Sequence, residues 1–166
     1  MPNAVDIGKT PYFNGTDAGS RAFLRQRTLE YNSAFAGLLA QAQTNLPGLV
    51  IRSPNFFSLL DNIVSNAPAF GLTNALDGGI MVDALTDPTF TNKQFAGPGT
   101  NHIFWDYLNP GAKAMSVVAD YAHQALTPSR LAALVPGAGS NRLDAVNLPI
   151  GATSRIEGTT NLISWT

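Results

Sequence analysis

A long run of apolar residues at helical spacing, between positions 20 and 45, restricts the fold of this chain more than any other sequence feature. Its apolar residues recur mainly three, four and seven positions apart, which is the spacing of one face of an amphipathic helix. Ser20 is a suitable N-cap, and a helix does not continue through Pro47-Gly48. The pattern predicts one helix over residues 20–45 with an apolar face formed by Phe23, Leu24, Tyr31, Phe35, Leu38, Leu39 and Ala42.

Two shorter helices and two short strands are expected further along the chain. Residues 55–66 carry four apolar residues on one face, and Pro110 suits the first turn of a helix that extends to about Leu126. The apolar runs at 49–51 and 103–105 are too short for helices and are typical of buried strands. Helices that alternate with short apolar strands predict an α/β fold.

The remaining segments up to residue 101 are irregular in pattern. Residues 4–11 are typical of a strand end followed by a turn, and residues 12–19 of a polar loop. Residues 75–101 form a long segment rich in glycine and proline. Loops of that length in a compact domain are commonly functional or mobile.

The composition changes after Thr127-Pro128. Residues 129–135 favour one or two helical turns, and residues 136–140, Pro-Gly-Ala-Gly-Ser, are typical of a linker. The last segment alternates in a strand-like manner. We therefore expect three parts: a domain at 1–127, a linker at 128–142, and an extended tail or the start of a β-module at 143–166.

Composition excludes several classes of function. Hydrophobic residues make up 45% of the chain and charged residues 13%, so a packed core is expected. A net charge of -1 offers no broad attraction for nucleic acid. No apolar run approaches the ~18 residues needed to span a membrane. With no cysteine and only two histidines, His102 and His123, we expect no metal site and no cofactor.

Residues 103–111, Ile-Phe-Trp-Asp-Tyr-Leu-Asn-Pro-Gly, resemble the last catalytic block of the GDSL or SGNH family of ester hydrolases. Members of that family read roughly F-W-D-x-x-H-P-T before a final helix. Four other segments are similar to family motifs and occur in the family's order: Asp6-Ile7-Gly8-Lys9-Thr10-Pro11 (D-x-G-x-T-P), Tyr31-Asn32-Ser33-Ala34-Phe35 (Y-N-x-x-L), Ser53-Pro54-Asn55-Phe56-Phe57-Ser58-Leu59-Leu60 (D-x-F-x-L-L) and Pro68-Ala69-Phe70-Gly71-Leu72-Thr73-Asn74 (P-x-x-Y-G-F-x-N).

The resemblance implies a partial flavodoxin-like SGNH-hydrolase fold of three layers, corresponding to the C-terminal half of the domain. In the family the motifs that carry the nucleophilic serine and the oxyanion hole precede the D-x-G-x-T-P turn. We therefore expect those positions to lie outside the sequence given. The family is mostly secreted or found at the cell surface, although residues 1–6 resemble no signal peptide.

The same resemblance identifies two candidate catalytic positions. Asp106 occupies the position of the triad carboxylate, and Asn109 occupies that of the histidine. An amide cannot act as a general base near neutral pH, so the substitution predicts loss of activity. The alternative interpretation is that Asp106 and Asn109 only cap the turn before Pro110.

Other candidate residues have structural explanations. Phe104 and Trp105 suit a core or a substrate-pocket wall. His102 is too far along a strand from Asp106 to replace the missing base, and a solvated or locally bonded ring is expected. His123 falls in the last turn of the final helix, where a cation is favourable. Arginines 21, 25 and 27 predict a solvated positive face.

Two functions from different classes remain open. The first is an ester hydrolase by descent, inactive as this chain, with an ester or acyl ligand. The second is a non-catalytic binding protein that reuses half of a hydrolase scaffold, with a cleft formed by Phe104, Trp105 and residues 75–101. Half of a sheet leaves apolar surface and a strand edge uncovered. We therefore expect self-association or an upstream hydrolase half as a partner.

Overall fold

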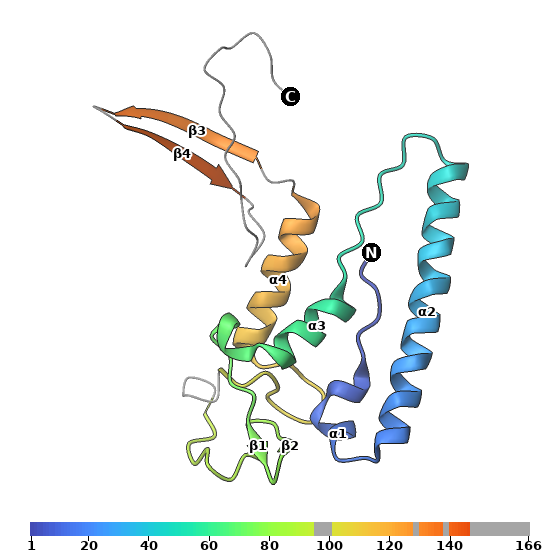
Figure 1. Ribbon diagram of the computed structural model, residues 1–166, viewed down its shortest axis with the longest axis vertical. Helices are drawn as coiled ribbons and strands as arrows, with labels where there is room; N and C mark the ends of the chain where they lie inside the picture. Colours follow the sequence, from blue (N-terminus) through green and yellow to red (C-terminus); the bar gives the residue numbers. More distant parts are fainter. Residues whose placement is uncertain (95–100, 128–129, 138–139, 147–166) are drawn as a thin grey trace. The chain divides into compact units, whose positions relative to one another are not determined.

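The computed structural model describes residues 1–94, 101–127, 130–137 and 140–146 (Figure 1). The chain divides into two compact units, Met1–Leu126 and Thr127–Thr166. Within the described residues the fold is mixed α and β and mainly helical, with four α-helices, two 3₁₀ helices (η) and two antiparallel strand pairs. No helix among these residues has the length and apolar character needed to cross a membrane.

The first long helix, α2 (Ala18–Asn45), confirms the prediction for residues 20–45 and starts two residues earlier. Asp17 is its N-cap and accepts a hydrogen bond from Ser20 N, so the expected cap at Ser20 was wrong. Before it, η1 (Ile7–Lys9) and α1 (Pro11–Asn14) replace much of the expected turn and polar loop. Pro11 explains α1 in part, because its fixed φ suits the first helical position.

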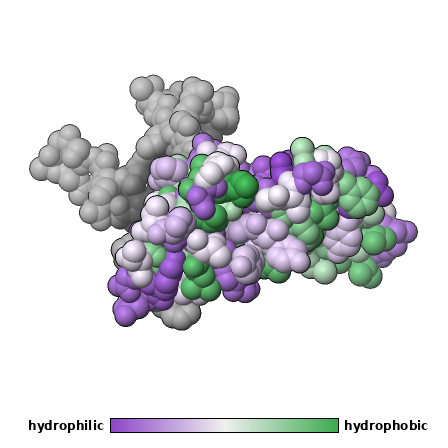
Figure 2. Space-filling model, turned by 90° about the horizontal axis from the view of Figure 1, so that it is seen from below, coloured by the Kyte–Doolittle hydropathy of each residue, from purple (hydrophilic) through white to green (hydrophobic). Residues whose placement is uncertain are grey.

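No side chain of α2 is buried in the described structure. Several of its large apolar residues are exposed, including Phe23, Tyr31 and Leu38 at 59–64% of their surface. Hydrophobic residues are visible among hydrophilic ones on the face drawn in Figure 2. The helix therefore presents apolar surface that this unit does not cover.

The core of unit 1 is formed by α3 (Phe56–Ser65), α4 (Ala112–Leu126) and the segments between them. Asn55 caps α3 by accepting from Ser58 N, which confirms the predicted start of that helix. The helix η2 (Ala67–Phe70) then ends at Gly71, whose φ of 65° is in the left-handed region that favours glycine. The buried core residues are Leu59, Ile63, Ala67, Leu72, Met81, Ile103, Phe104, Ala114 and Val117.

Residues 75–94 contain an irregular loop, as expected, and a small hairpin that the sequence did not predict. Strands β1 (Leu76–Asp77) and β2 (Ile80–Met81) pair antiparallel across Gly78 and Gly79, both with positive φ. Two consecutive positive φ values are what a tight hairpin turn requires. The expected strands at 49–51 and 103–105 are not assigned as strands; the second forms one isolated bridge, between Phe104 and Pro110.

Unit 2 contains β3 (Arg130–Gly137) and β4 (Ser140–Val146), which pair antiparallel with Gly137 opposite Ser140. The prediction of helical turns at 129–135 was therefore wrong. Leucine and alanine suit helices locally, but pairing with a partner strand decides such short runs. The expected linker residues 128–142 lie largely within this hairpin, and the tail beyond residue 146 lies outside the described residues.

Candidate functional site

The candidate catalytic positions form one short turn between the core segment 103–105 and α4. Asp106 Oδ1 accepts hydrogen bonds from Leu108 N at 3.0 Å and Asn109 N at 2.8 Å. The Asn109 amide, Nδ2, lies 3.0 Å from Oδ1 and 2.8 Å from Oδ2 of the same carboxylate. The backbone closes the turn with Trp105 N donating to Asn109 O at 2.8 Å. The structure therefore brings Asp106 and Asn109 together.

The electrostatics of the turn favour an ionised carboxylate. The Asn109 side chain, followed by the backbone N–H groups of Asn109 and Leu108, lowers the pKa of Asp106 below its ordinary value. Asp106 is half-buried and Asn109 is exposed. The carboxylate can orient a donor at position 109, but an amide there supplies no proton acceptor of useful basicity.

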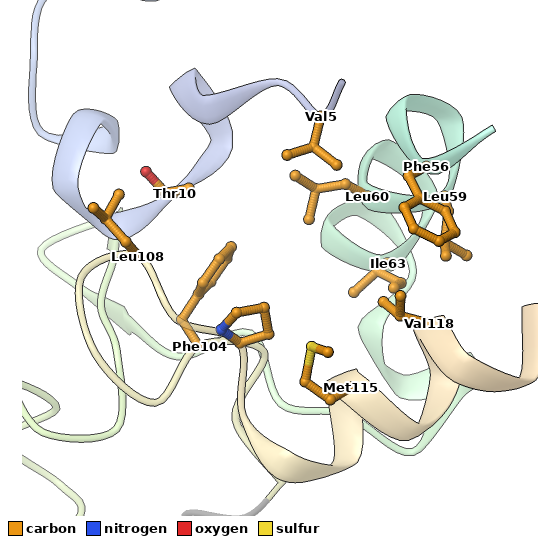
Figure 3. A pocket seen from close by; sticks show the side chains of 11 residues that line it. Val5, Thr10, Phe56, Leu59, Leu60, Ile63, Phe104, Leu108, Met115 and Val118 are labelled. Atoms are coloured by element: carbon orange, nitrogen blue, oxygen red, sulfur yellow. The ribbon is translucent and has the colours of Figure 1, made fainter. Parts of the chain in front are cut away.

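An apolar pocket of about 240 Å³ adjoins this turn (Figure 3). Leu108 and Pro110, the neighbours of Asn109 in the chain, are part of its wall. Figure 3 shows the side chains arranged around an open centre, with α3 and α4 on one side and the N-terminal segment and the turn on the other. The lining residues are Val5, Thr10, Phe56, Leu59, Leu60, Ile63, Phe104, Leu108, Pro110, Met115 and Val118.

Of the two predicted pocket-wall residues, Phe104 lines this pocket and Trp105 does not. Trp105 is half-buried, and its backbone bonds to Asn109 and to Leu85. None of the described residues of the 75–101 segment lines the pocket. The wall comes mainly from α3 and α4, for which the sequence predicted helices but no pocket.

His102 is buried and hydrogen-bonded, so of the two alternatives expected from the sequence, a solvated or a locally bonded ring, the solvated one was wrong. It is only 6% exposed, and its Nε2 lies 2.9 Å from Oδ2 of Asp87, which is equally buried. Burial raises the pKa of Asp87, but hydrogen bonds from His102 and Thr89 outweigh it and lower the pKa to about 2. His102 Nδ1 is buried without a partner among the described residues. This Asp–His pair is enclosed, so it offers no general base to a substrate.

Two of the three arginines of α2 bond to other parts of unit 1 and do not form the solvated face expected from the sequence. Arg25 forms ion pairs with Asp6 at 2.8 Å and with Asp61 of α3 at 2.6 Å. Asp6 is 2% exposed, so this network ties the N-terminal segment, α2 and α3 together. Arg21 donates to backbone carbonyls of Asn14 and Thr16. Only Arg27 fits the expectation, since it pairs with Glu30 near the surface.

The part of the chain that the structure describes contains no group of three or more histidine, cysteine, aspartate or glutamate residues that could hold a metal ion. No protein-family model and no curated protein matches this chain.

Proposed function

We propose that unit 1 descends from GDSL/SGNH hydrolases that act on carboxylic ester bonds, and that this chain does not itself hydrolyse esters. The observation that carries the proposal is the Asp106 turn. An extended core segment ends in a carboxylate, the residue three positions later bonds to both of its oxygens, and a helix follows after proline. That is the order of the family's last block, with asparagine in place of histidine.

The arrangement of extended segments supports the finer fold proposal, a partial three-layer flavodoxin-like domain. The N-terminal segment runs beside the segment before α3 in the same direction, since Met1 N bonds to Arg52 O and Asn3 bonds to Asn55 (Figure 1). Thr73 and His102 form an isolated parallel bridge. The N-terminal segment and the segment before α3 are connected through α2, and parallel neighbours connected through helices are characteristic of doubly wound α/β folds.

The proposed inactivity follows from the chemistry at position 109. A triad needs a base that takes the proton of the nucleophile and a carboxylate that orients that base. Asp106 binds an amide instead, and the buried His102 bonds to Asp87. Loss of the general base alone lowers a rate by ~10²–10⁴-fold.

Hydrolysis of p-nitrophenyl acetate and p-nitrophenyl butyrate by the purified chain tests the inactivity. We expect no turnover above the buffer rate. The Asp106→Asn variant is the matched control, because it keeps a side chain of the same shape in the turn. Turnover above buffer that this variant abolishes would contradict the proposal.

The second candidate is a non-catalytic binding or interaction protein that reuses part of a hydrolase scaffold. Two observations favour it: the apolar pocket beside the substituted turn, and the exposed apolar side chains of α2. The first suits a small ligand such as an ester or acyl group. The second suits self-association or an upstream hydrolase half, the partners expected from the sequence.

A further inference from the structure

We propose that the cavity between α3, α4 and the Asp106–Asn109 turn binds a small uncharged apolar molecule, a hydrocarbon chain or ring of up to about eight carbon atoms. The inference rests on the second candidate function, binding of a small ligand in this pocket, and does not depend on descent from ester hydrolases. It concerns what the cavity holds, whether or not the neighbouring turn ever took part in catalysis.

The chemistry of the wall selects an apolar occupant. Ten of the eleven lining residues are hydrocarbon, proline or thioether side chains, and Thr10 has the sole hydroxyl group. That hydroxyl donates to Ile7 O at 2.7 Å, so its proton is already used within the chain. A polar group placed inside would lose its water without gaining a donor, which is unfavourable. The part of a ligand that enters must therefore be hydrocarbon.

The size of the cavity limits the occupant. Its volume of about 240 Å³ is below the ~300–1,000 Å³ of pockets for drug-sized ligands. A methylene group needs roughly the volume of a water molecule, about 30 Å³, so about eight carbon atoms fill the space. Dry apolar cavities of about 150 Å³ in other proteins bind benzene, so a cavity of this size is sufficient for a ligand.

Exposed apolar side chains at the mouth of the cavity provide an entry route and contribute to the affinity for a ligand. Three lining side chains are themselves large exposed hydrophobic groups: Val5 at 37%, Leu108 at 51% and Met115 at 49%. Figure 3 shows them on different sides of the open centre. An occupant would remove apolar surface from water on all three, which is the main source of affinity for such ligands.

The charge beside the mouth disfavours anions. Asp106 Oδ1 is 3.0 Å from the backbone nitrogen of Leu108, a lining residue, and the carboxylate also accepts from the backbone nitrogen and the side-chain amide of Asn109. A ligand carboxylate at this edge would meet a like charge. A 1-alkanol is therefore expected to bind better than the carboxylate of equal chain length, by about fivefold for charges close together in water.

Titration of the full chain with a 1-alkanol series from butanol to decanol, followed by calorimetry or amide NMR shifts, tests the inference. We expect saturable binding that tightens about fourfold per added methylene and levels off near eight carbons, where the cavity is full. Octanoate should bind about fivefold more weakly than 1-octanol. Absence of saturable binding, or affinity that keeps rising through decanol, would overturn the proposal.

Two exposed positions of α4 give a matched pair of variants. Met115→Asp introduces a charge into the wall and should weaken 1-octanol binding at least tenfold. Leu126→Asp changes another exposed hydrophobic residue of α4 that lies outside the wall, and should leave 1-octanol binding unchanged. Val5→Phe should fill the cavity from the opposite side and shift the levelling-off to shorter chains. Equal weakening by both aspartates, or affinity that falls with protein concentration because a second copy fills the cavity, would overturn the inference.

Discussion

The carboxylates of Asp106 and Asp87 each bind a side chain that contains nitrogen. The two pairs differ in their exposure and in what they can do chemically. Asp106 lies in a half-exposed turn and holds an amide three residues away. Asp87 is buried and holds an imidazole fifteen residues away. The first pair is available to solvent but lacks a base, whereas the second pair has a base but is enclosed. Neither residue pair alone provides a working triad.

Restoring the imidazole tests whether the Asp106 turn retains the geometry of a triad carboxylate. In Asn109→His we expect the imidazole pKa to lie above its ordinary value of about 6.5, because the adjacent carboxylate stabilises the charged form. The increase should be less than about one unit, since the site is exposed. The pKa is measured by NMR titration of the ring protons.

The control is the same substitution in an Asp106→Asn background, where the imidazole should titrate at its ordinary value. Equal pKa values in the two backgrounds would show that Asp106 does not engage the ring.

At the scale of elements, loop 82–94 is held by two carboxylates acting as local caps. Asp83 accepts from Leu85 N and Thr86 N, and Asp87 accepts from Thr89. The Asp87–His102 bond then attaches the loop to the segment that leads into Asp106. Phe90 packs on the His102 ring at a centroid distance of 5.3 Å. The loop is therefore fixed by a few polar contacts rather than by regular secondary structure.

This attachment predicts a pH-dependent contribution to stability. The folded pKa of Asp87, about 2, is below the ordinary value of 3.8 for this carboxyl group. The contribution is therefore fully present above about pH 4 and is lost as the pH falls towards 2. Asp87→Asn should lower the free energy of unfolding by roughly 2 kcal/mol at pH 7.

Urea unfolding at several pH values measures this difference. Asp77→Asn, which changes an exposed carboxylate in the β1–β2 hairpin, is the control and should have little effect. The difference between wild type and Asp87→Asn should shrink on acidification below pH 4. A difference that stays constant to pH 2 would mean that the carboxylate charge does not stabilise the loop.

At the scale of the whole molecule, the main feature is the apolar surface of α2, which unit 1 leaves exposed. Tyr31 and Leu38, seven residues apart, share a face and are 59% and 64% exposed. Burying a side chain of this kind contributes about 1.5–3 kcal/mol. Burial of these side chains against a second surface would therefore favour association through this helix.

We expect the purified chain to self-associate with increasing concentration in size-exclusion chromatography with light scattering. Leu38→Glu should weaken the association, because it places a charge on the exposed apolar face. Leu29→Glu is the matched control: Leu29 is also an exposed leucine of α2, but nine residues away and so on the opposite face. A monomer at all concentrations, or equal effects of the two variants, would contradict this prediction.

The sequence by itself determined the three longer helices and the Asp106–Asn109 turn. Apolar periodicity and the breaking residues located α2, α3 and α4 to within about two residues, whereas α1 was not predicted and the cap of α2 was expected at Ser20 instead of Asp17. The turn joins residues three positions apart, so its hydrogen bonds depend on neighbours in the chain. Local patterns suffice here because helices and turns are stabilised largely by contacts within a few residues.

Only the tertiary structure decided the remaining features. His102 bonds to Asp87, which is fifteen residues away in the sequence, and Arg25 bonds to Asp61, which is thirty-six residues away. The cavity wall combines four separate segments of the chain. Residues 130–137 became a strand because residues 140–146 pair with them, although their local propensity favoured a helix. Such outcomes depend on which distant groups meet on folding, and a pattern of near neighbours does not contain that information.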